Sequence, residues 1–431
     1  MLDIKFIRSN PDAVKKGCKS KNVDIDIDRL LEIDSKRNDF LRSIEEIQFQ
    51  KNRANEKIKE SSKEEKEAII TEMRELGDRE DSLNKEFKEI DDEFRYLMFS
   101  IPNPPFDTVP IGKDDSKNIV LRKEGEKPKF DFDPKNYLDI AENLNVIDVK
   151  RAAKVSGSRF GYLKGDVALM EFALIQLAMN IATDKGFVPV VPPVIIKPDM
   201  MERMGYIKRT FNDTKKDWEG EDVYFLKDDP LLLVGTSEQS IGPMHADEIF
   251  EKKDLPIRYI GFSSCFRREA GSYGKDTKGI LRVHQFDKIE MFSFCTPEES
   301  VKEHQLLLSI EEEIMKKLGL HYQVIDICTG DLGDPAASKY DIEAWMPGQG
   351  EYRETHSTSN CTDFQSRRLN IRYRNPDGIN FVHMLNGTAL PIGRIIIAII
   401  ENYQQEDGSI RVPEVLKAYI GKDLIKKETD L

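Results

Sequence analysis

The stretch from Cys265 to Phe294, CFRREAGSYGKDTKGILRVHQFDKIEMFSF, decides the fold that we predict for this chain. An apolar run of β-type residues from Ile257 leads into it, and a segment rich in Gly and Lys follows. A second apolar run, from Val283, completes the stretch. This order is typical of two antiparallel strands joined by a long loop.

The two predicted strands bring polar and aromatic side chains to one face. Since residues two apart share a face of a strand, Arg267 and Glu269 should lie together on the first strand. By the same rule, Phe286 and Glu290 should lie together on the second. A cation, an aromatic ring and two carboxylates could bind a nucleotide and an amino acid together. On this stretch alone, a solvated hairpin with surface salt bridges is the simpler interpretation.

Length and composition indicate a soluble protein of more than one domain. The chain has 431 residues, too many for one ordinary core, and its residues are 33% charged and 39% hydrophobic. The longest aliphatic run, Ile395 to Ile400, is too short to span a membrane. The first residues, Met1 to Asp12, lack the apolar core of a secretory signal. We therefore expect a cytoplasmic protein that does not associate with a membrane.

Cysteine usage and charge narrow the chemistry further. The five cysteines, at positions 18, 265, 295, 328 and 361, form no Cys-x-x-Cys pair. We therefore expect neither a zinc site nor a disulfide framework. The formal net charge of −13 argues against wrapping by nucleic acid but allows a local basic patch.

Two seams of mainly apolar residues, spaced alternately three and four apart, predict a pair of long helices near the N-terminus. The seams run over residues 30–58 and 69–97. Between them, Ser62 and Glu65 have the spacing of a capping box, so the second helix can begin there, and Pro102 ends it. We expect an antiparallel hairpin about 45–50 Å long. An oligomerising coiled coil is the alternative, but the short connection favours a hairpin within one chain.

Charge is unevenly distributed on this hairpin. Residues 36–66 hold nine Lys or Arg against seven Asp or Glu, whereas residues 67–93 hold four against eleven. If the hairpin contacts a phosphate backbone, we expect the cations near the tip of the first helix to make the contact. A solvated charged face is the alternative for any one of them. These cations are Lys51, Arg53, Lys57 and Lys59.

The composition divides the chain into three parts. Residues 102–130 are rich in Pro, Gly, Asp and Lys and are predicted to form a linker. Residues 1–101 would then form an N-terminal domain, with the helical hairpin at about 29–99. Residues 131–431 would form a second domain, in which short β-type runs alternate with helices.

Several motifs, read together, resemble the seryl-tRNA synthetases, a family of class II aminoacyl-tRNA synthetases. The resemblance covers nearly the whole chain. The three short motifs of the class are matched by Pro193, by Arg267-Arg268-Glu269 and by Arg394. Further stretches typical of the family are RAAKVSGSRF at 151–160, IEAWMP at 342–347, SNCTDFQ at 359–365 and ENYQQ at 401–405.

The resemblance implies an α+β fold with two parts. An antiparallel β-sheet catalytic domain flanked by helices, the class II synthetase fold, would follow an N-terminal antiparallel α-helical coiled-coil arm. The resemblance also implies a homodimer, with Pro193 at the dimer interface.

The activity implied is that of a serine–tRNA ligase, with L-serine, ATP and tRNA(Ser) as substrates. Serine and ATP would give seryl-adenylate and pyrophosphate, and serine would then pass to the 3′ end of tRNA(Ser). By resemblance, Arg267 would hold the α-phosphate, Arg282 would reach the terminal phosphates, and Arg394 would cover the adenine and contact the γ-phosphate. Arginine suits this role because its planar fork binds phosphate oxygens and never deprotonates. The other ATP-binding residues implied are Arg268, Glu269, Val283, Phe286, Glu354, Thr355, His356 and Ser357.

The resemblance also assigns residues to the metal and to serine. Glu354 and Ser357 would bind Mg²⁺, which prefers oxygen ligands. Many members have Val-Ser where this chain has Thr355-His356, so His356 is interpreted as structural or as lying at the edge of the nucleotide, rather than as a general base. Ala389 and Pro391 also depart from the common pattern. The serine-binding residues implied are Thr236, Ser237, Glu238, Arg267, Glu290 and Thr388.

Two other functions are compatible with these residues. One is a synthetase-like ligase that loads an amino acid onto a carrier protein, and the other is a non-catalytic paralogue that binds tRNA. The long arm argues against the first, and the retained Arg267, Glu354 and Arg394 argue against the second. The sequence leaves open whether selenocysteine tRNA, tRNA(Sec), is a second acceptor.

Overall fold

The computed structural model describes residues 1–209, 218–219, 222–270 and 278–427. The chain divides into two compact units, which we describe separately. The first comprises Met1–Lys19, Val23–Pro102 and Lys208–Trp218. The second comprises Ser20–Asn22, Asn103–Ile207 and Glu219–Leu431.

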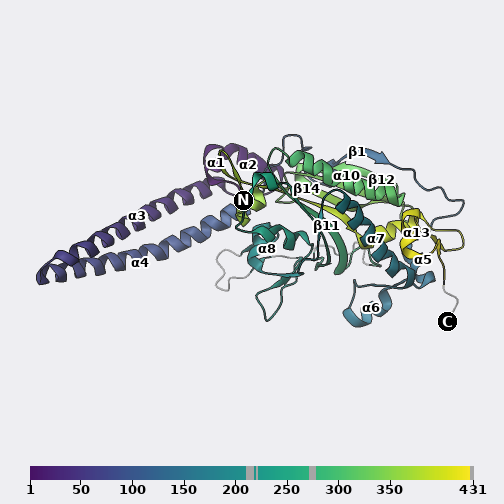
Figure 1. Ribbon diagram of the computed structural model, residues 1–431, viewed down its shortest axis with the longest axis horizontal. Helices are drawn as coiled ribbons and strands as arrows, with labels where there is room; N and C mark the ends of the chain where they lie inside the picture. Colours follow the sequence, from purple (N-terminus) through teal and green to yellow (C-terminus); the bar gives the residue numbers. More distant parts are fainter. Residues whose placement is uncertain (210–217, 220–221, 271–277, 428–431) are drawn as a thin grey trace. The chain divides into compact units, whose positions relative to one another are not determined.

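The first unit is a helical hairpin with a small base (Figure 1). Two short helices, α1 (Ile4–Ser9) and α2 (Pro11–Ser20), precede the long helices α3 (Ile27–Glu60) and α4 (Lys63–Ser100). The capping box predicted at the start of α4 is present, because the backbone N–H of Ser62 donates to Glu65 Oε2 over 2.8 Å.

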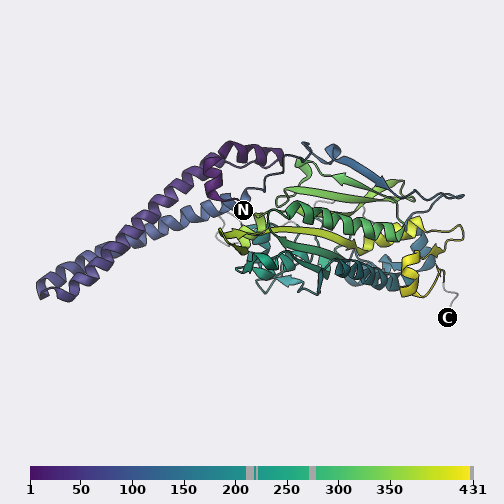
Figure 2. The same cartoon turned by 45° about the horizontal axis from the view of Figure 1, so that its top comes forward.

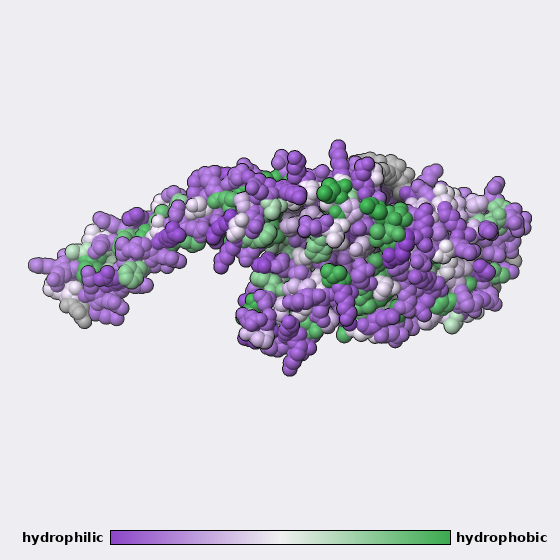
Figure 3. Space-filling view, turned by 90° about the horizontal axis from the view of Figure 1, so that it is seen from above, coloured by the Kyte–Doolittle hydropathy of each residue, from purple (hydrophilic) through white to green (hydrophobic). Residues whose placement is uncertain are grey.

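Side chains from both predicted seams pack between α3 and α4. Every seam position on α3 is buried or half-buried, and every one on α4 is half-buried. Ion pairs between the helices fix their register: Arg29 Nε lies 2.8 Å from Glu93, Arg37 Nε 2.6 Å from Asp91 and Lys51 Nζ 2.6 Å from Glu80. Helices of 34 and 38 residues are about 51 and 57 Å long, somewhat longer than predicted. The outer surface of the hairpin is mainly hydrophilic (Figure 3).

The second unit is built on an eight-stranded sheet (Figure 2). All neighbouring strands are antiparallel except β4, which lies parallel to β10 at one edge. The strand–loop–strand predicted from the sequence is the pair β10 and β11, and β10 lies next to the edge strand β4. In order across the sheet the strands are β1 (Ile119–Glu124), β12 (Tyr322–Asp326), β13 (Ser338–Met346), β14 (Glu351–Asn360), β17 (His383–Pro391), β11 (Gln285–Cys295), β10 (Ile257–Phe266) and β4 (Val188–Val190).

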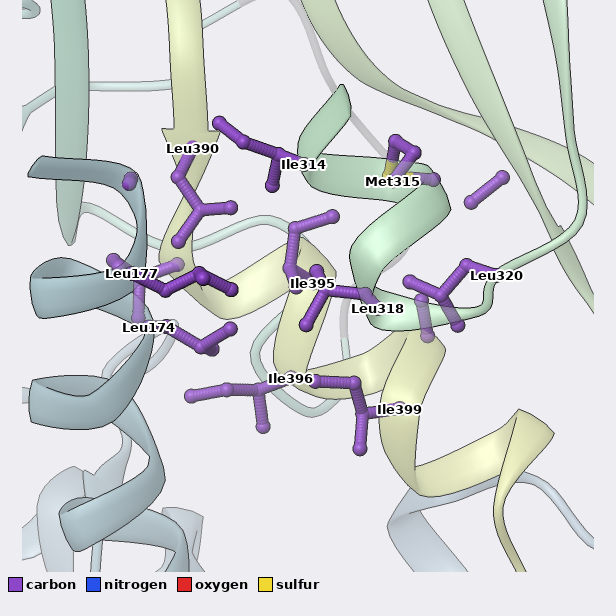
Figure 4. Close-up of a cluster of buried hydrophobic side chains, with 14 of the residues drawn as sticks. Leu174, Leu177, Ile314, Met315, Leu318, Leu320, Leu390, Ile395, Ile396 and Ile399 are labelled. Carbon is purple, nitrogen blue, oxygen red and sulfur yellow. The ribbon is translucent and has the colours of Figure 1, made fainter. Parts of the chain in front are cut away.

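Three helices, α7 (Gly165–Asp184), α10 (Ser300–Leu318) and α12 (Ile392–Asn402), pack against the sheet and form the main core with it. Figure 4 shows Leu174 from α7, Leu318 from α10 and Ile396 from α12 meeting in this core. Each such side chain is fully buried or nearly so, and burying it contributes about 1.5–3 kcal/mol. The sheet is therefore held rigidly from its helical side.

The smaller elements lie around this centre. Two short strands, β5 (Ile195–Ile196) and β8 (Leu232–Leu233), pair with each other, as do β2 (Ile147–Asp148) and β3 (Tyr162–Leu163), and β18 (Ile410–Arg411) and β19 (Leu424–Ile425). Another small sheet contains β9 (Ile249–Glu251), β15 (Arg372–Asn375) and β16 (Gly378–Phe381). The remaining α-helices are α5 (Tyr137–Leu144), α6 (Val149–Ser156), α8 (Pro198–Met204), α9 (Glu238–Ile241), α11 (Phe364–Leu369) and α13 (Glu414–Ile420).

The segment predicted as a linker, residues 102–130, is a packed part of the second unit beyond Pro102. It supplies the edge strand β1, which pairs with β12. Near its start, the Asn103 side chain donates to the carbonyl oxygens of Pro335 and Cys361 over 2.9 Å each. The sequence pattern gave no sign of β1, because turn-forming residues surround a strand of only six residues.

Helix α7 is the only described helix long and apolar enough, by composition, to cross a membrane. Half of its apolar window is buried within the protein, where Met170, Leu174 and Ala178 contribute to the main core. A core helix of a soluble protein has these properties, and we interpret α7 as such a helix.

Candidate active site

Two cavities open on the face of the sheet opposite the main core. Along β11, alternation sends Ile289 and Met291 into the core, whereas Lys288 and Glu290 line the cavities. The larger cavity has a volume of about 550 Å³ and the smaller about 90 Å³. Four residues line both, so the two cavities meet there. They are Arg267, Lys288, Glu354 and Thr388.

A β-bulge brings Glu354 and Ser357 to the same cavity. Residues three apart on a regular strand face opposite ways. Here the register shifts, because His356 pairs with Ile342 whereas Glu354 pairs with Glu343. The extra residue in β14 realigns the side chains, so that both the carboxylate and the hydroxyl line the larger cavity.

The larger cavity is lined by all but one of the residues predicted to bind serine. Glu290 Oε1 lies 2.9 Å from Lys288 Nζ and accepts from Thr388 Oγ1 over 3.3 Å. Among the described residues, Glu290 Oε2 and Thr236 Oγ1 have no hydrogen-bond partner, although both are buried. Buried polar atoms without partners are costly, so these two atoms suit a polar ligand.

Glu238 lies in the same cavity, where the hydroxyl of Tyr206 donates to its Oε1. Ser237 differs from its prediction, because it does not line the cavity. It is buried, and its hydroxyl donates to the carbonyl oxygen of Gly261 over 3.4 Å. Its neighbour Gln239 lines the cavity instead.

The environment of Glu238 predicts a pH dependence of serine binding. Burial, and next the charge of Glu290, raise the pKa of Glu238 from 4.5 to about 7. Only an ionised carboxylate can pair with an ammonium group, so protonation below about pH 7 removes that attraction. We expect the dissociation constant of serine to rise up to about tenfold per pH unit below that pKa, as measured by calorimetry. In Glu238→Gln, binding should be weaker and this dependence lost, whereas an unchanged profile would contradict the assignment.

The smaller cavity is lined by most of the residues predicted to bind ATP. Arg282 Nη1 lies 2.7 Å from Glu269 Oε2, and Arg394 Nη1 donates to the carbonyl oxygen of Glu354 over 2.8 Å. Val283 and Thr355 also line this cavity. The arginines that line this cavity, Arg267, Arg282 and Arg394, come from three separate segments of the chain.

Arg267 and Phe286 are brought together as predicted, but not by two strand faces. Strand β10 ends at Phe266, so Arg267 and Glu269 lie beyond it, and Glu269 has a left-handed φ of 53°. The Arg267 guanidinium carbon lies 5.3 Å from the centre of the Phe286 ring. The Arg267 Nε also donates to the carbonyl oxygen of Gly235 over 3.2 Å, which fixes the guanidinium in the cavity.

The two remaining predicted ATP contacts, Arg268 and His356, do not line either cavity. The backbone N–H of Arg268 donates to the carbonyl oxygen of Asp222 over 2.9 Å. The His356 ring is fully buried, with Nδ1 2.9 Å from Thr355 Oγ1. Burial lowers the pKa of His356 to about 3. A neutral ring buried away from the cavity fits the structural interpretation of this departure.

The cations predicted to contact tRNA have different surroundings. Lys51 is half-buried and paired with Glu80 between the helices, so its charge is largely neutralised. Arg53 is exposed and lies over the Phe49 ring, with 5.8 Å from the guanidinium carbon to the ring centre. Lys57 and Lys59 are exposed in the last turns of α3. Pro193, predicted at a dimer interface, is exposed between β4 and β5.

Several residues that line the larger cavity were not predicted from the sequence, and among them are Tyr206, Lys288 and Lys339. The signal for Lys288 was present, because it lies midway between Phe286 and Glu290 in the same alternating row. Nothing local marked Tyr206, which follows a short helix and reaches the cavity only through the tertiary fold.

Comparisons with known proteins match this chain to tRNA synthetases over nearly its whole length. Residues 1–105 match the family model described as the seryl-tRNA synthetase N-terminal domain. Residues 224–403 match the class II tRNA synthetase core domain (G, H, P, S and T).

Full-length relatives include the serine–tRNA ligases of Thermodesulfovibrio yellowstonii and Thermobifida fusca. The first is 42% identical, covering 99% of this chain and 100% of the relative. The second is 45% identical and covers 99% of each.

Among solved structures, the seryl-tRNA synthetase of Pyrococcus horikoshii complexed with ATP has a TM-score of 0.87 and 38% identity, with all of both chains covered. The cytoplasmic serine–tRNA ligase of Naegleria fowleri in complex with AMP has a TM-score of 0.83 and 30% identity, covering 100% of this chain and 99% of the other.

Proposed function

Because this chain belongs to the seryl-tRNA synthetase family, we propose that the two joined cavities are the active site in which it activates serine and charges tRNA. The protein is an ATP-dependent serine–tRNA ligase of the class II fold. One observation supports the proposed site most strongly. Glu290 and Thr388 lie at the larger cavity, the arginines gather at the smaller one, and the two cavities meet at Arg267.

In the first step, a serine carboxylate oxygen attacks the α-phosphorus of ATP. A bond forms between them while the bond from that phosphorus to pyrophosphate breaks. Arg267 would stabilise the charge on the α-phosphate, and Arg282 and Arg394 would hold the outer phosphates. Rigid cations aimed at developing charge lower such a barrier because they need no reorganisation. Phe286, beside Arg267, offers an aromatic face for the adenine.

Serine itself would be held by the groups of the larger cavity. The carboxylates of Glu238 and Glu290 suit its ammonium group and its hydroxyl, and Thr388 adds a second polar contact. An amino acid without the hydroxyl would leave buried polar atoms unpaired, which disfavours alanine strongly. In the second step, a terminal ribose hydroxyl of tRNA attacks the carbonyl carbon and releases AMP.

Glu354 and Ser357 fit a magnesium ion that arrives with the phosphates. Desolvation acts to raise the pKa of Glu354, but the charges of Arg394, Lys339, Arg267 and Lys288 together outweigh it and lower that pKa, so the carboxylate is ionised. Among the described residues, no three His, Cys, Asp or Glu form a group that could hold a metal ion. Phosphate oxygens would therefore complete the shell of a hard cation. When bound, the ion would neutralise phosphate charge.

Removing the Glu354 carboxylate tests this assignment. In Glu354→Gln, we expect the magnesium concentration needed for half-maximal exchange of pyrophosphate into ATP to rise by at least about tenfold. Glu343→Gln is a matched control, because Glu343 is the cross-strand partner of Glu354 but accepts from Gln323 over 2.7 Å, outside the cavities. An equal magnesium requirement in both variants would exclude Glu354 as a ligand.

The helical arm would bind the acceptor tRNA through the exposed cations of α3. Arg53, Lys57 and Lys59 are the strongest candidates, because Lys51 already has a partner in Glu80. A purely electrostatic contact of this kind weakens steeply with salt. The same contact would accept any tRNA with a suitably placed backbone, tRNA(Sec) included.

Self-association is the further expectation, with Pro193 at the interface. Apolar side chains close to it in the sequence support the proposal, since Val191 is 85% exposed and Val188 is 54% exposed. Large exposed apolar residues in one region suit an interface better than solvent. A homodimer working in the cytoplasm would be consistent with this surface and with five buried free cysteines.

A charging assay tests the proposed function. Purified protein, ATP, magnesium and labelled serine should transfer serine to tRNA(Ser) transcripts and not to a holo acyl-carrier protein. Transfer to the carrier protein alone would favour the carrier-protein ligase, and no transfer with tRNA binding intact would favour the non-catalytic paralogue.

A further inference from the structure

Lys288 is a buried cation at the point where the two cavities meet. It lies on β11 between Phe286 and Glu290, and it is only 7% exposed. Arg267 is the other cation that lines both cavities. A lysine is rarely buried to this extent without a specific partner.

The partner in this structure is Glu290, whose Oε1 lies 2.9 Å from Lys288 Nζ. An ammonium group has three donors, however, and this contact uses one. Glu290 Oε1 also accepts from Thr388, while its Oε2 has no partner among the described residues. Lys288 therefore has donors, and Glu290 an acceptor oxygen, that remain available to a ligand.

The charged residues around the point where the two cavities meet determine which charged groups a ligand can place there. Four carboxylates line the larger cavity: Asp222, Glu238, Glu290 and Glu354. They suit the ammonium group of an amino acid, but they repel its carboxylate. If Arg267 neutralises the α-phosphate, the substrate carboxylate needs a second cation beside it. Lys288 lies next to Glu290 and lines the junction, whereas Lys339 lines only the larger cavity and pairs with Asp341 at 3.1 Å.

We infer that Lys288 binds the carboxylate of the amino acid substrate and holds one of its oxygens toward the α-phosphorus. The inference rests on the proposed function and adds a substrate contact to it. In the reaction, the carboxylate oxygen forms its bond to phosphorus, and the electron pair of the broken bond leaves with pyrophosphate. Lys288 keeps its protons throughout and acts through its charge. Lys288 and Glu238 would then hold the two charged ends of one zwitterion, with Glu290 left for its hydroxyl.

A pair of ligands separates this role from a structural one. Serine and serinamide share the ammonium group and the hydroxyl, but serinamide has no carboxylate charge. In the unaltered protein we expect serine to bind at least about tenfold more tightly than serinamide, because charged hydrogen bonds are the stronger ones. In Lys288→Met, we expect the two to bind within about twofold of each other. Any general damage to the pocket, including the loss of a partner for Glu290, affects both ligands and cancels in the ratio.

The experiment is calorimetric titration of the full chain with both ligands, combined with thermal unfolding to check the fold of each variant. Lys288→Gln provides a second neutral side chain, which can still donate to Glu290, and it should also lose the preference. It serves as the test variant if Lys288→Met fails to fold. Lys288→Arg should retain part of the preference, and Lys339→Met, at a half-buried lysine that lines only the larger cavity, should retain all of it.

A full preference for serine in folded Lys288→Met or Lys288→Gln would overturn the inference. The proposed function is tested separately, by serine-dependent exchange of pyrophosphate into ATP with the unaltered protein. Exchange by that protein together with an unchanged ligand preference in the variants would leave the function standing and remove the role of Lys288.

Discussion

Replacing Arg267 by alanine is expected to lower serine-dependent exchange of pyrophosphate into ATP by about 10²–10³-fold. The guanidinium lies where the two cavities meet, held by the carbonyl oxygen of Gly235 and with its carbon 5.3 Å from the centre of the Phe286 ring. Its removal leaves the α-phosphate without a fixed cation in the transition state. The loss should fall mainly on kcat, because that charge interaction strengthens as the new bond forms.

Two further variants define the cause of this loss. Arg267→Lys keeps the charge but not the planar fork, and it should recover only a small part of the activity. Arg374→Ala is the surface control, because Arg374 is exposed on β15 and pairs with Glu251 at 3.3 Å. Such an exposed pair contributes little to stability, so exchange should be unchanged. Exchange retained by Arg267→Ala would show that the reaction occurs elsewhere.

Shortening the helical arm is expected to abolish tRNA charging while leaving amino acid activation intact. Two contacts define which residues of α3 and α4 lie side by side. Arg37 contacts Asp91, and Gln48 contacts Glu80. Removing residues 44–84 and joining the ends by a short Gly-rich turn follows this register. It keeps the small core at the base of the hairpin, where Leu30 and Met98 are buried. We expect charging to fall by at least about 10³-fold, the usual span between specific and non-specific binding, with exchange within about twofold of the full chain.

Charge reversal on the intact arm tests the same idea without a deletion. Lys57→Glu combined with Lys59→Glu should weaken tRNA binding and reduce its salt dependence. Lys85→Glu with Lys88→Glu makes the same change of charge at exposed positions of α4 and should have a smaller effect. If exchange and charging fell together in the shortened protein, the arm would be needed for folding or activation rather than for tRNA.

The parts of the fold that the sequence predicts well are those with a strong period. The seams of α3 and α4 and the capping box at Ser62 follow from side-chain spacing alone. The pair β10 and β11 is also clear, because two apolar runs flank a loop rich in glycine. In contrast, β1 is a short edge strand within a Pro- and Gly-rich segment, and only its pairing with β12 reveals it.

The site needed the tertiary structure at particular points. Strict alternation places Glu354 and Ser357 on opposite faces, and only the register shift in β14 unites them. Arg267 was expected on a strand, yet it follows the end of β10 and is directed by Gly235, a residue from another segment. Tyr206 reaches Glu238 from a distant helix end. Local sequence patterns carry no information about such contacts. The alternation along β11, in contrast, was sufficient to place Lys288 on the same face as Phe286 and Glu290.

The most direct test of the account is amino-acid-dependent exchange of pyrophosphate into ATP, compared for serine, threonine, cysteine and alanine. It measures activation alone, so it needs no tRNA and does not depend on the arm. Serine should support exchange at a rate at least about 10³-fold above alanine, because alanine leaves Glu290 and Thr388 without their hydroxyl partner. A folded protein that shows no exchange with serine, or equal exchange with alanine, would contradict the central claim.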